Sequence, residues 1–265
     1  MKKIKILIFC TLSLLLSGCS LKFPGRQEQT TTEEIIAASS GEDDFLDINA
    51  DIKESTRTDA ETSSAFKLST IPEYNGSAYV TVNNDVPFFS SREKETTSCY
   101  RNYGQLDSLG RATSSIMYTC KEELPDEERE GLEDLKPSGW EQAKYPGIVD
   151  SEPAFVYNRS HLLMWALIGN ESDVIENVIT GTRYFNTQAM LPNEEIVLNF
   201  IKSSDMHVLY RVTPYYKGDN LLAEGVLMEA MSVEDNGKSL SLCRWAYNVQ
   251  PGIKIDYKTG KNEKE

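Results

Sequence analysis

The alternation of side chains in the last third of the chain is the feature that most restricts its fold. Residues 206–213, 222–232 and 239–247 place valine, leucine and aromatic residues in alternation. A period of two is typical of β-strands that bury one face. The pair Asn236-Gly237 predicts a tight hairpin turn between the last two segments, because both residue types tolerate positive φ. These segments therefore predict an antiparallel meander.

Other segments extend this picture to a mixed fold. Residues 78–82 and 112–120 also have the composition of strands. Residues 192–202 predict a helix that begins at a proline and carries one apolar stripe at helical spacing. The stripe consists of Val197, Phe200 and Ile201. Because 40% of the 265 residues are hydrophobic, we expect one sizeable α+β domain with a central antiparallel sheet.

The N-terminus has the pattern of a bacterial targeting segment. Three lysines precede an apolar run at residues 6–16, which is too short to span a membrane comfortably. Leu16-Ser17-Gly18-Cys19 then resembles a lipobox, in which the signal peptidase cuts before the cysteine. We expect residues 1–18 to be a signal peptide and lipids on Cys19 to anchor the protein to the membrane. The alternative is an ordinary secretion signal with an incidental cysteine.

Residues 19–68 are acidic and poor in aromatic side chains. Such a segment cannot bury enough apolar surface to fold, so we expect a disordered stalk, with residues 69–265 as the folded domain. An acidic arm that lies in a basic cleft is the functional alternative. The net charge of −14 argues against a protein that coats nucleic acid through bulk electrostatics, but it allows an enzyme with a local basic cleft.

The stretch Tyr157-Asn158-Arg159-Ser160-His161 carries the most reactive side chains. His161 is one of only two histidines and follows an arginine closely. A neutral imidazole accepts a proton near pH 7, and a guanidinium binds phosphate oxygens through a planar fork. The amide oxygen of an asparagine is a hard ligand suited to Mg²⁺. Together these groups predict a metal-assisted phosphodiesterase, although a histidine alone is more often a core residue bonded to backbone.

The same stretch resembles a nuclease motif. Asn158-Arg159-Ser160-His161 is similar to the Asp-Arg-Gly-His motif of the secreted, sequence-nonspecific DNA/RNA endonucleases of Gram-positive bacteria, the streptodornase-like group. Further matching pieces, in chain order, are Gly104-x-Leu106-Asp107, Gly139-Trp140, Tyr210-Arg211-Val212-Thr213-Pro214 and Asn248-Val249-Gln250-Pro251-Gly252. The resemblance covers residues 71–265 and implies a ββα-metal (His-metal finger) site on the α+β fold. This chain departs from the family motif at Asn158, where the family has aspartate, and at Ser160, where it has glycine. The motif therefore does not fix the metal preference or the rate of this protein.

The resemblance also implies roles for individual residues. His161 would be the general base, and Asn186 rather than Asn177 would be the metal ligand. Mg²⁺ is the expected ion, with Mn²⁺ as an alternative, and one protein ligand suffices because Mg²⁺ keeps most of its waters. Asn177 would orient the imidazole or a metal-bound water. The bland alternative is that both asparagines cap turns.

Three further side chains complete the predicted site. Arg159 and Arg183 would neutralise charge that grows on the phosphoryl oxygens. Glu195 matches the family position of an acid that holds metal waters. Alternatively, Glu194 and Glu195 only favour the N-terminus of the predicted helix.

The second histidine and the cysteines are not assigned to this site. His207 lies in an alternating segment without an arginine or amide neighbour of the right kind, so we expect a structural role. The predicted domain holds Cys99, Cys120 and Cys243. The sequence is equally compatible with a disulfide between Cys99 and Cys120 and with all three cysteines as buried, reduced thiols. No cysteine spacing matches a zinc motif.

These observations predict an extracellular, membrane-anchored, Mg²⁺-dependent DNA endonuclease with little sequence preference. The resemblance implies 5′-phosphate ends and allows RNA as a second substrate. We expect a monomer whose partners are nucleic acid and, through lipidated Cys19, the membrane. The alternative is a noncatalytic surface lipoprotein that binds DNA or another ligand. Retention of His161 together with Asn186 argues against that alternative.

Overall fold

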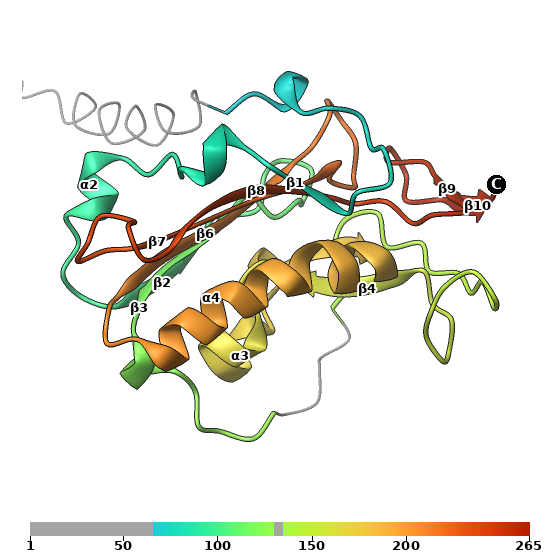
Figure 1. Ribbon diagram of the computed structural model, residues 1–265. Coiled ribbons are helices and arrows are strands. Elements are labelled where there is room, and N and C mark those ends of the chain that lie inside the picture. Colours follow the sequence, from blue (N-terminus) through green and yellow to red (C-terminus); the bar gives the residue numbers. More distant parts are fainter. Residues whose placement is uncertain (1–65, 130–134) are drawn as a thin grey trace, which may run out of the picture. The chain divides into compact units, whose positions relative to one another are not determined.

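The computed structural model describes residues 66–129 and 135–265, and its main element is a six-stranded antiparallel sheet (Figure 1). The strand order is β1-β8-β7-β6-β3-β2. The strands are β1 (Tyr79–Thr81), β2 (Tyr100–Tyr103), β3 (Ser115–Thr119), β6 (Val208–Tyr215), β7 (Gly225–Ser232) and β8 (Ser241–Tyr247). The α+β fold with a central antiparallel sheet is confirmed, and five of these strands lie where side-chain alternation predicted them. Strand β2 was not anticipated.

The C-terminal meander forms as the alternation predicted. Strands β6, β7 and β8 pair in sequence order, with Tyr210 opposite Ala230 and Ala230 opposite Leu242. The turn between β7 and β8 contains Asn236 and Gly237, both with positive φ (53° and 81°). This left-handed conformation costs little for asparagine and glycine, which is why this dipeptide marks the turn.

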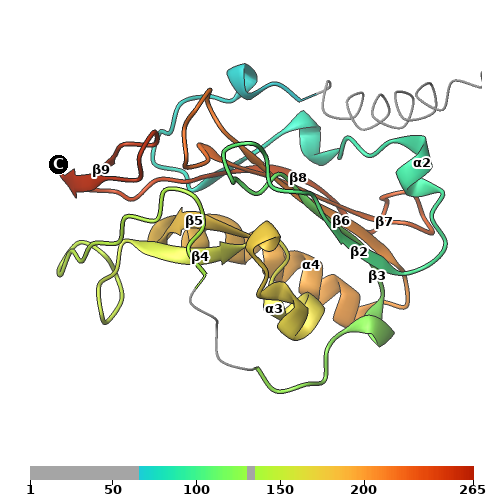
Figure 2. The same ribbon diagram turned by 180° about the vertical axis from the view of Figure 1, so that it is seen from behind.

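Both faces of the sheet are covered, so alternate residues of one strand belong to different cores. On β7, Val226, Met228 and Ala230 pack toward helix α4 (Leu191–Ser203). The intervening Leu227 faces the core formed with Trp245 on the opposite side. Figures 1 and 2 show α4 on one side of the sheet and the segment with α2 (Ser91–Lys94) on the other.

The predicted helix at residues 192–202 is confirmed as α4, which has Pro192 in its first turn. Val197 and Ile201 are fully buried against the sheet, and Phe200 packs partly against the same core. A π-helical segment, η6 (Phe185–Met190), leads directly into α4. The other short elements are η1 (Leu68–Thr70), η2 (Asn83–Asp85), η3 (Lys121–Glu123), α3 (Trp165–Ile168), η4 (Gly169–Ser172), η5 (Ile175–Asn177), β9 (Ile253–Ile255) and β10 (Asn262–Lys264).

The packed region begins before Ser69, earlier than the composition suggested. Phe66 is buried, and its ring centroid lies 4.6 Å from that of Tyr215 and 5.9 Å from that of Trp245. The signal peptide, Cys19 and the rest of the expected stalk lie outside the described residues. Within residues 66–129 and 135–265, no helix has the length and apolarity needed to cross a membrane.

A second, smaller sheet carries the predicted reactive stretch. Strand β4 (Tyr157–His161) pairs antiparallel with β5 (Val178–Thr182), and η6 and α4 follow β5 directly. This order of two strands and a helix is the ββα arrangement expected from the sequence. It lies on the α4 side of the main sheet (Figure 2).

Candidate active site

Strand β4 presents Arg159 and His161 two residues apart, so the two side chains share one face. Both line a cleft of about 810 Å³. The guanidinium of Arg159 lies over the Trp140 ring, 4.7 Å from its centroid, and its Nε donates to the carbonyl of Leu135. Trp140 is therefore a packing anchor beside the site. The intervening Ser160 is fully buried and packs closely on Gly181 of β5, where a Cβ atom would lie 2.2 Å from its Oγ.

The imidazole of His161 is held by a carboxylate that the sequence did not reveal. Its Nε2 lies 2.7 Å from Oδ1 of Asp173, and both side chains are only about a tenth exposed. Burial lowers the pKa of His161, while Asp173 opposes this shift and Arg129 adds to it. The imidazole is therefore neutral at pH 7, with Nδ1 left for another partner. Asp173 is twelve residues away in sequence and has no motif signal.

Asn177 does not contact the imidazole, which corrects the role expected for it. Its side chain is fully buried, and its Oδ1 accepts a hydrogen bond from the N–H of Leu163. Its Nδ2 donates to the carbonyls of Leu163 and Ser172. Because both ends of the amide are occupied by backbone groups, Asn177 fixes the chain on either side of the site and does not reach the cleft.

The π-helical segment and helix α4 contribute Asn186 and Glu194, and both side chains line the cleft with His161. In a regular α-helix, residues eight positions apart point about 80° away from each other. The wider turns of a π-helix rotate less per residue, which brings the two side chains toward one face. Such segments occur frequently at functional sites.

The acid that faces the cleft is Glu194, and the expectation that it would be Glu195 is wrong. Glu195 is exposed, whereas Glu194 is 7% exposed and lines the cleft. Burial, with a smaller contribution from the charge of Glu195, raises the pKa of Glu194 to about 8. Neighbouring helical residues point about 100° apart, so the register of the helix decides which glutamate turns inward.

Three arginines give the cleft a local positive character despite the acidic chain. Arg129, Arg159 and Arg183 all line it. The Nε of Arg183 is buried and makes no hydrogen bond to a described residue. A buried donor without a partner is costly, so this atom is suited to a ligand with acceptor oxygens.

The motif at residues 248–252 positions the site from the C-terminal end of the chain. Asn248 is fully buried, accepts a hydrogen bond from the N–H of Thr182 and donates to the carbonyls of Thr180 and Ala223. The side chain of Gln250 accepts from the N–H of Tyr184. These bonds tie β5 to the main sheet on both sides of Arg183, which explains why the motif accompanies the reactive stretch.

The donor set of the cleft fits a hard divalent cation. Asn186 offers an amide oxygen, and Glu194 offers a carboxylate that forms no hydrogen bond or ion pair with any residue in the described ranges. Oxygen ligands of this kind are those that Mg²⁺ and Ca²⁺ prefer. A buried carboxylate without a partner is stabilised in its charged form by a nearby cation, so these two residues could hold the metal.

Comparison with known proteins agrees with this geometry. A family model described as DNA/RNA non-specific endonuclease matches residues 91–234, which is more than half of the chain. The chain therefore belongs to this family and is a nucleic-acid hydrolase. No curated protein matches.

Solved nuclease structures share the fold. NucA from Streptococcus agalactiae with magnesium ion bound aligns with a TM-score of 0.63 at 19% identity, over 78% of this chain and 96% of that one. The same nuclease with no metal bound aligns with a TM-score of 0.62 over 83% and 99% of the two chains. The Sda1 nuclease with bound zinc ion is 26% identical, with a TM-score of 0.52 over 63% and 82%.

Proposed function

We propose that the protein is a Mg²⁺-dependent DNA endonuclease that cleaves with little sequence preference. The observation that carries the proposal is the convergence of His161, Asn186, Glu194 and Arg183 on one cleft. Asn186 and Glu194 would hold the metal, and the magnesium ion bound to the similar NucA structure supports Mg²⁺ as a candidate. Family membership sets aside the noncatalytic alternative.

His161 is the general base in this proposal. Because Nε2 pairs with Asp173, Nδ1 is the nitrogen that accepts the proton from the attacking water. Asp173 holds the imidazole in the correct tautomer and stabilises the imidazolium once the proton has moved. The lowered pKa of His161 keeps the base unprotonated at neutral pH, as general-base catalysis requires.

The arginines bind the substrate. Arg183 lines the cleft, and its buried Nε makes no hydrogen bond to a described residue, so a phosphoryl oxygen would satisfy it. Arg159 lies on the same strand face as His161. Both charges stabilise negative charge that grows on the phosphate. A bound Mg²⁺ supplies Lewis-acid stabilisation of the scissile phosphate and of the leaving 3′ oxygen. RNA offers the same phosphodiester chemistry, so it is a second substrate to be tested.

Plasmid digestion tests this function directly. We expect cleavage with Mg²⁺, none with EDTA, and recovery when Mg²⁺ is restored. His161→Ala should lose roughly 10²–10⁴-fold in rate while retaining its melting temperature, and Glu195→Gln is the matched control because that side chain is exposed. Cleavage at the wild-type rate by folded His161→Ala protein would exclude this mechanism.

We further propose that residues 1–18 direct export and that lipids on Cys19 anchor the enzyme at the extracellular face of the membrane. The support is the lipobox pattern Leu16-Ser17-Gly18-Cys19. In the native host, Cys19→Ala should move the protein from the membrane fraction to the medium. Unchanged membrane attachment of this variant would rule out the lipid anchor.

A further inference from the structure

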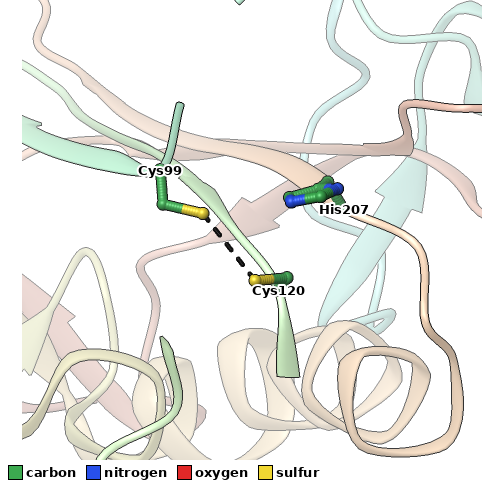
Figure 3. Close-up of side chains that lie close together, drawn as sticks. All are labelled: Cys99, Cys120 and His207. Carbon is green, nitrogen blue, oxygen red and sulfur yellow. Dashed lines mark hydrogen bonds between the residues drawn. The ribbon is translucent and has the colours of Figure 1, made fainter. Parts of the chain in front are cut away.

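A second cluster of ligand side chains lies at one end of the main sheet, outside the catalytic cleft. Cys99 directly precedes β2, Cys120 directly follows β3, and His207 directly precedes β6. These three strands are antiparallel neighbours in the order β6-β3-β2. The start of β2, the end of β3 and the start of β6 therefore lie side by side at one end of the sheet. Figure 3 shows the two sulfurs and a ring nitrogen of His207 directed toward a common centre.

The distances within the cluster match those of a tetrahedral metal site. The two sulfurs lie 3.7 Å apart, and all three ligand atoms lie within 4.8 Å of one another. Two thiolates on one tetrahedral zinc ion, each with a bond of about 2.3 Å, lie about 3.8 Å apart. A disulfide needs a sulfur–sulfur distance of about 2.05 Å. The observed separation is that of a thiol–thiol hydrogen bond, is too long for a disulfide, and would also fit two thiolates on one metal ion.

His207 is oriented as a metal-binding imidazole usually is. Its Nδ1 lies 2.5 Å from Oε1 of Glu234, and its backbone N–H donates to the other carboxylate oxygen. The ring also stacks on Tyr118, with centroids 5.0 Å apart. A carboxylate on one ring nitrogen fixes the tautomer and leaves Nε2 as the ligand atom. His207 lies outside the nuclease cleft, as expected, but its orientation also suits a metal ligand.

We infer that Cys99, Cys120 and His207 bind a thiophilic transition metal ion, for which Zn²⁺ is the best fit. A water molecule or the exposed Glu122 carboxylate would take the fourth position. Binding releases the two thiol protons to solvent and involves no change of oxidation state. The ion joins β2, β3 and β6 at one end of the sheet, so its role is structural.

The competing state is a disulfide between the same two cysteines, which an oxidising compartment permits. Both cysteines are free in the structure. A ring nitrogen of His207 lies within 4.8 Å of both sulfurs, and a disulfide has no use for this third ligand atom.

Cobalt substitution tests the inference on the full chain. The protein, reduced and freed of metal, should develop a sulfur-to-cobalt charge-transfer band when Co²⁺ is added, and Zn²⁺ should then abolish it. The oxygen ligands of the catalytic cleft cannot produce such a band, so nuclease activity and this site are assessed independently. Zn²⁺ should also raise the melting temperature measured in the presence of Mg²⁺.

Variants locate the signal. Cys99→Ser and Cys120→Ser should abolish the band, while Cys243→Ala should retain it, because that thiol is fully buried elsewhere in the sheet. Glu234→Gln should weaken Co²⁺ affinity roughly 10- to 100-fold without removing the band. Absence of the band from folded wild-type protein would overturn the inference. The inference would also be overturned if protein isolated without reductant contained no metal and had a mass two hydrogen atoms below that of the reduced chain, because that mass identifies the disulfide.

Discussion

Burial shifts the pKa values of two side chains of the cleft, His161 and Glu194, in opposite directions. Burial lowers the pKa of His161 and raises that of Glu194 to about 8. At pH 7 both groups are therefore neutral before a cation binds. Each gives a pH dependence that can be measured separately.

Glu194 should make the metal-free protein less stable at high pH. Its folded-state pKa of about 8 lies above the ordinary value of 4.5, so its contribution to stability is complete below 4.5 and is lost as pH rises through 8. In EDTA, Glu194→Gln should therefore raise the melting temperature at pH 9 but not at pH 5. Mg²⁺ should stabilise wild type and not this variant, and Glu195→Gln should keep most of the pH dependence because burial is the main cause of the shift. If the difference in melting temperature between Glu194→Gln and wild type were the same at pH 5 and pH 9, the raised pKa assigned to Glu194 would be contradicted.

Asp173 should control the acidic side of the pH–rate profile. Its carboxylate raises the pKa of His161 against the effect of burial. Asp173→Asn removes that charge, so the pKa of His161 falls further and the acidic limb of kcat/KM shifts to lower pH. The rate on the plateau should also fall, because the imidazole loses its orienting partner. A shift of the limb to higher pH, or no shift, would show that Asp173 does not act on the base.

At the scale of elements, the π-helical segment η6 sets the register between Asn186 and Glu194. Insertion of one alanine after the exposed Gln188 adds roughly 100° of helical rotation between Asn186 and Glu194 and therefore turns Asn186 away from Glu194. Misplacement by about 1 Å costs roughly 10²-fold in rate, so we expect a loss of at least that size in kcat and a weaker Mg²⁺ response. Gln188→Ala, which keeps the residue count, is the control. Equal rates for the insertion and the substitution would refute this role of η6.

Elements with a clear period were predictable from sequence, whereas register and long-range pairing were not. The alternation in β6 to β8 and the stripe Val197, Phe200 and Ile201 specify which face is buried. Nothing local distinguishes Glu194 from Glu195, because the π-turn that turns one inward depends on packing against the sheet. An irregular loop places Asp173 next to His161, and no local sequence pattern encodes that placement. The sequence also does not show that the side chain of Asn177 makes three hydrogen bonds to backbone groups.

At the scale of the whole molecule, the N-terminal limit of the folded domain can be tested by truncation. Phe66 packs on Tyr215 and Trp245, and loss of a buried phenylalanine costs about 3–5 kcal/mol. A protein that starts at Ser69 should therefore melt on the order of 10 °C below one that starts a few residues before Phe66. Phe66→Ala in the longer protein should reproduce most of the difference. Equal melting temperatures would mean that Phe66 contributes nothing to the core.

The attachment of β5 by Asn248 and Gln250 also has a consequence for the order of synthesis. These side chains follow β4, β5 and α4 in the chain, yet they fix the backbone on both sides of Arg183. A nascent chain that stops before residue 248 lacks these bonds, even when β4 and α4 have already been made. The cleft is therefore completed only after residues 248–250 have emerged from the ribosome.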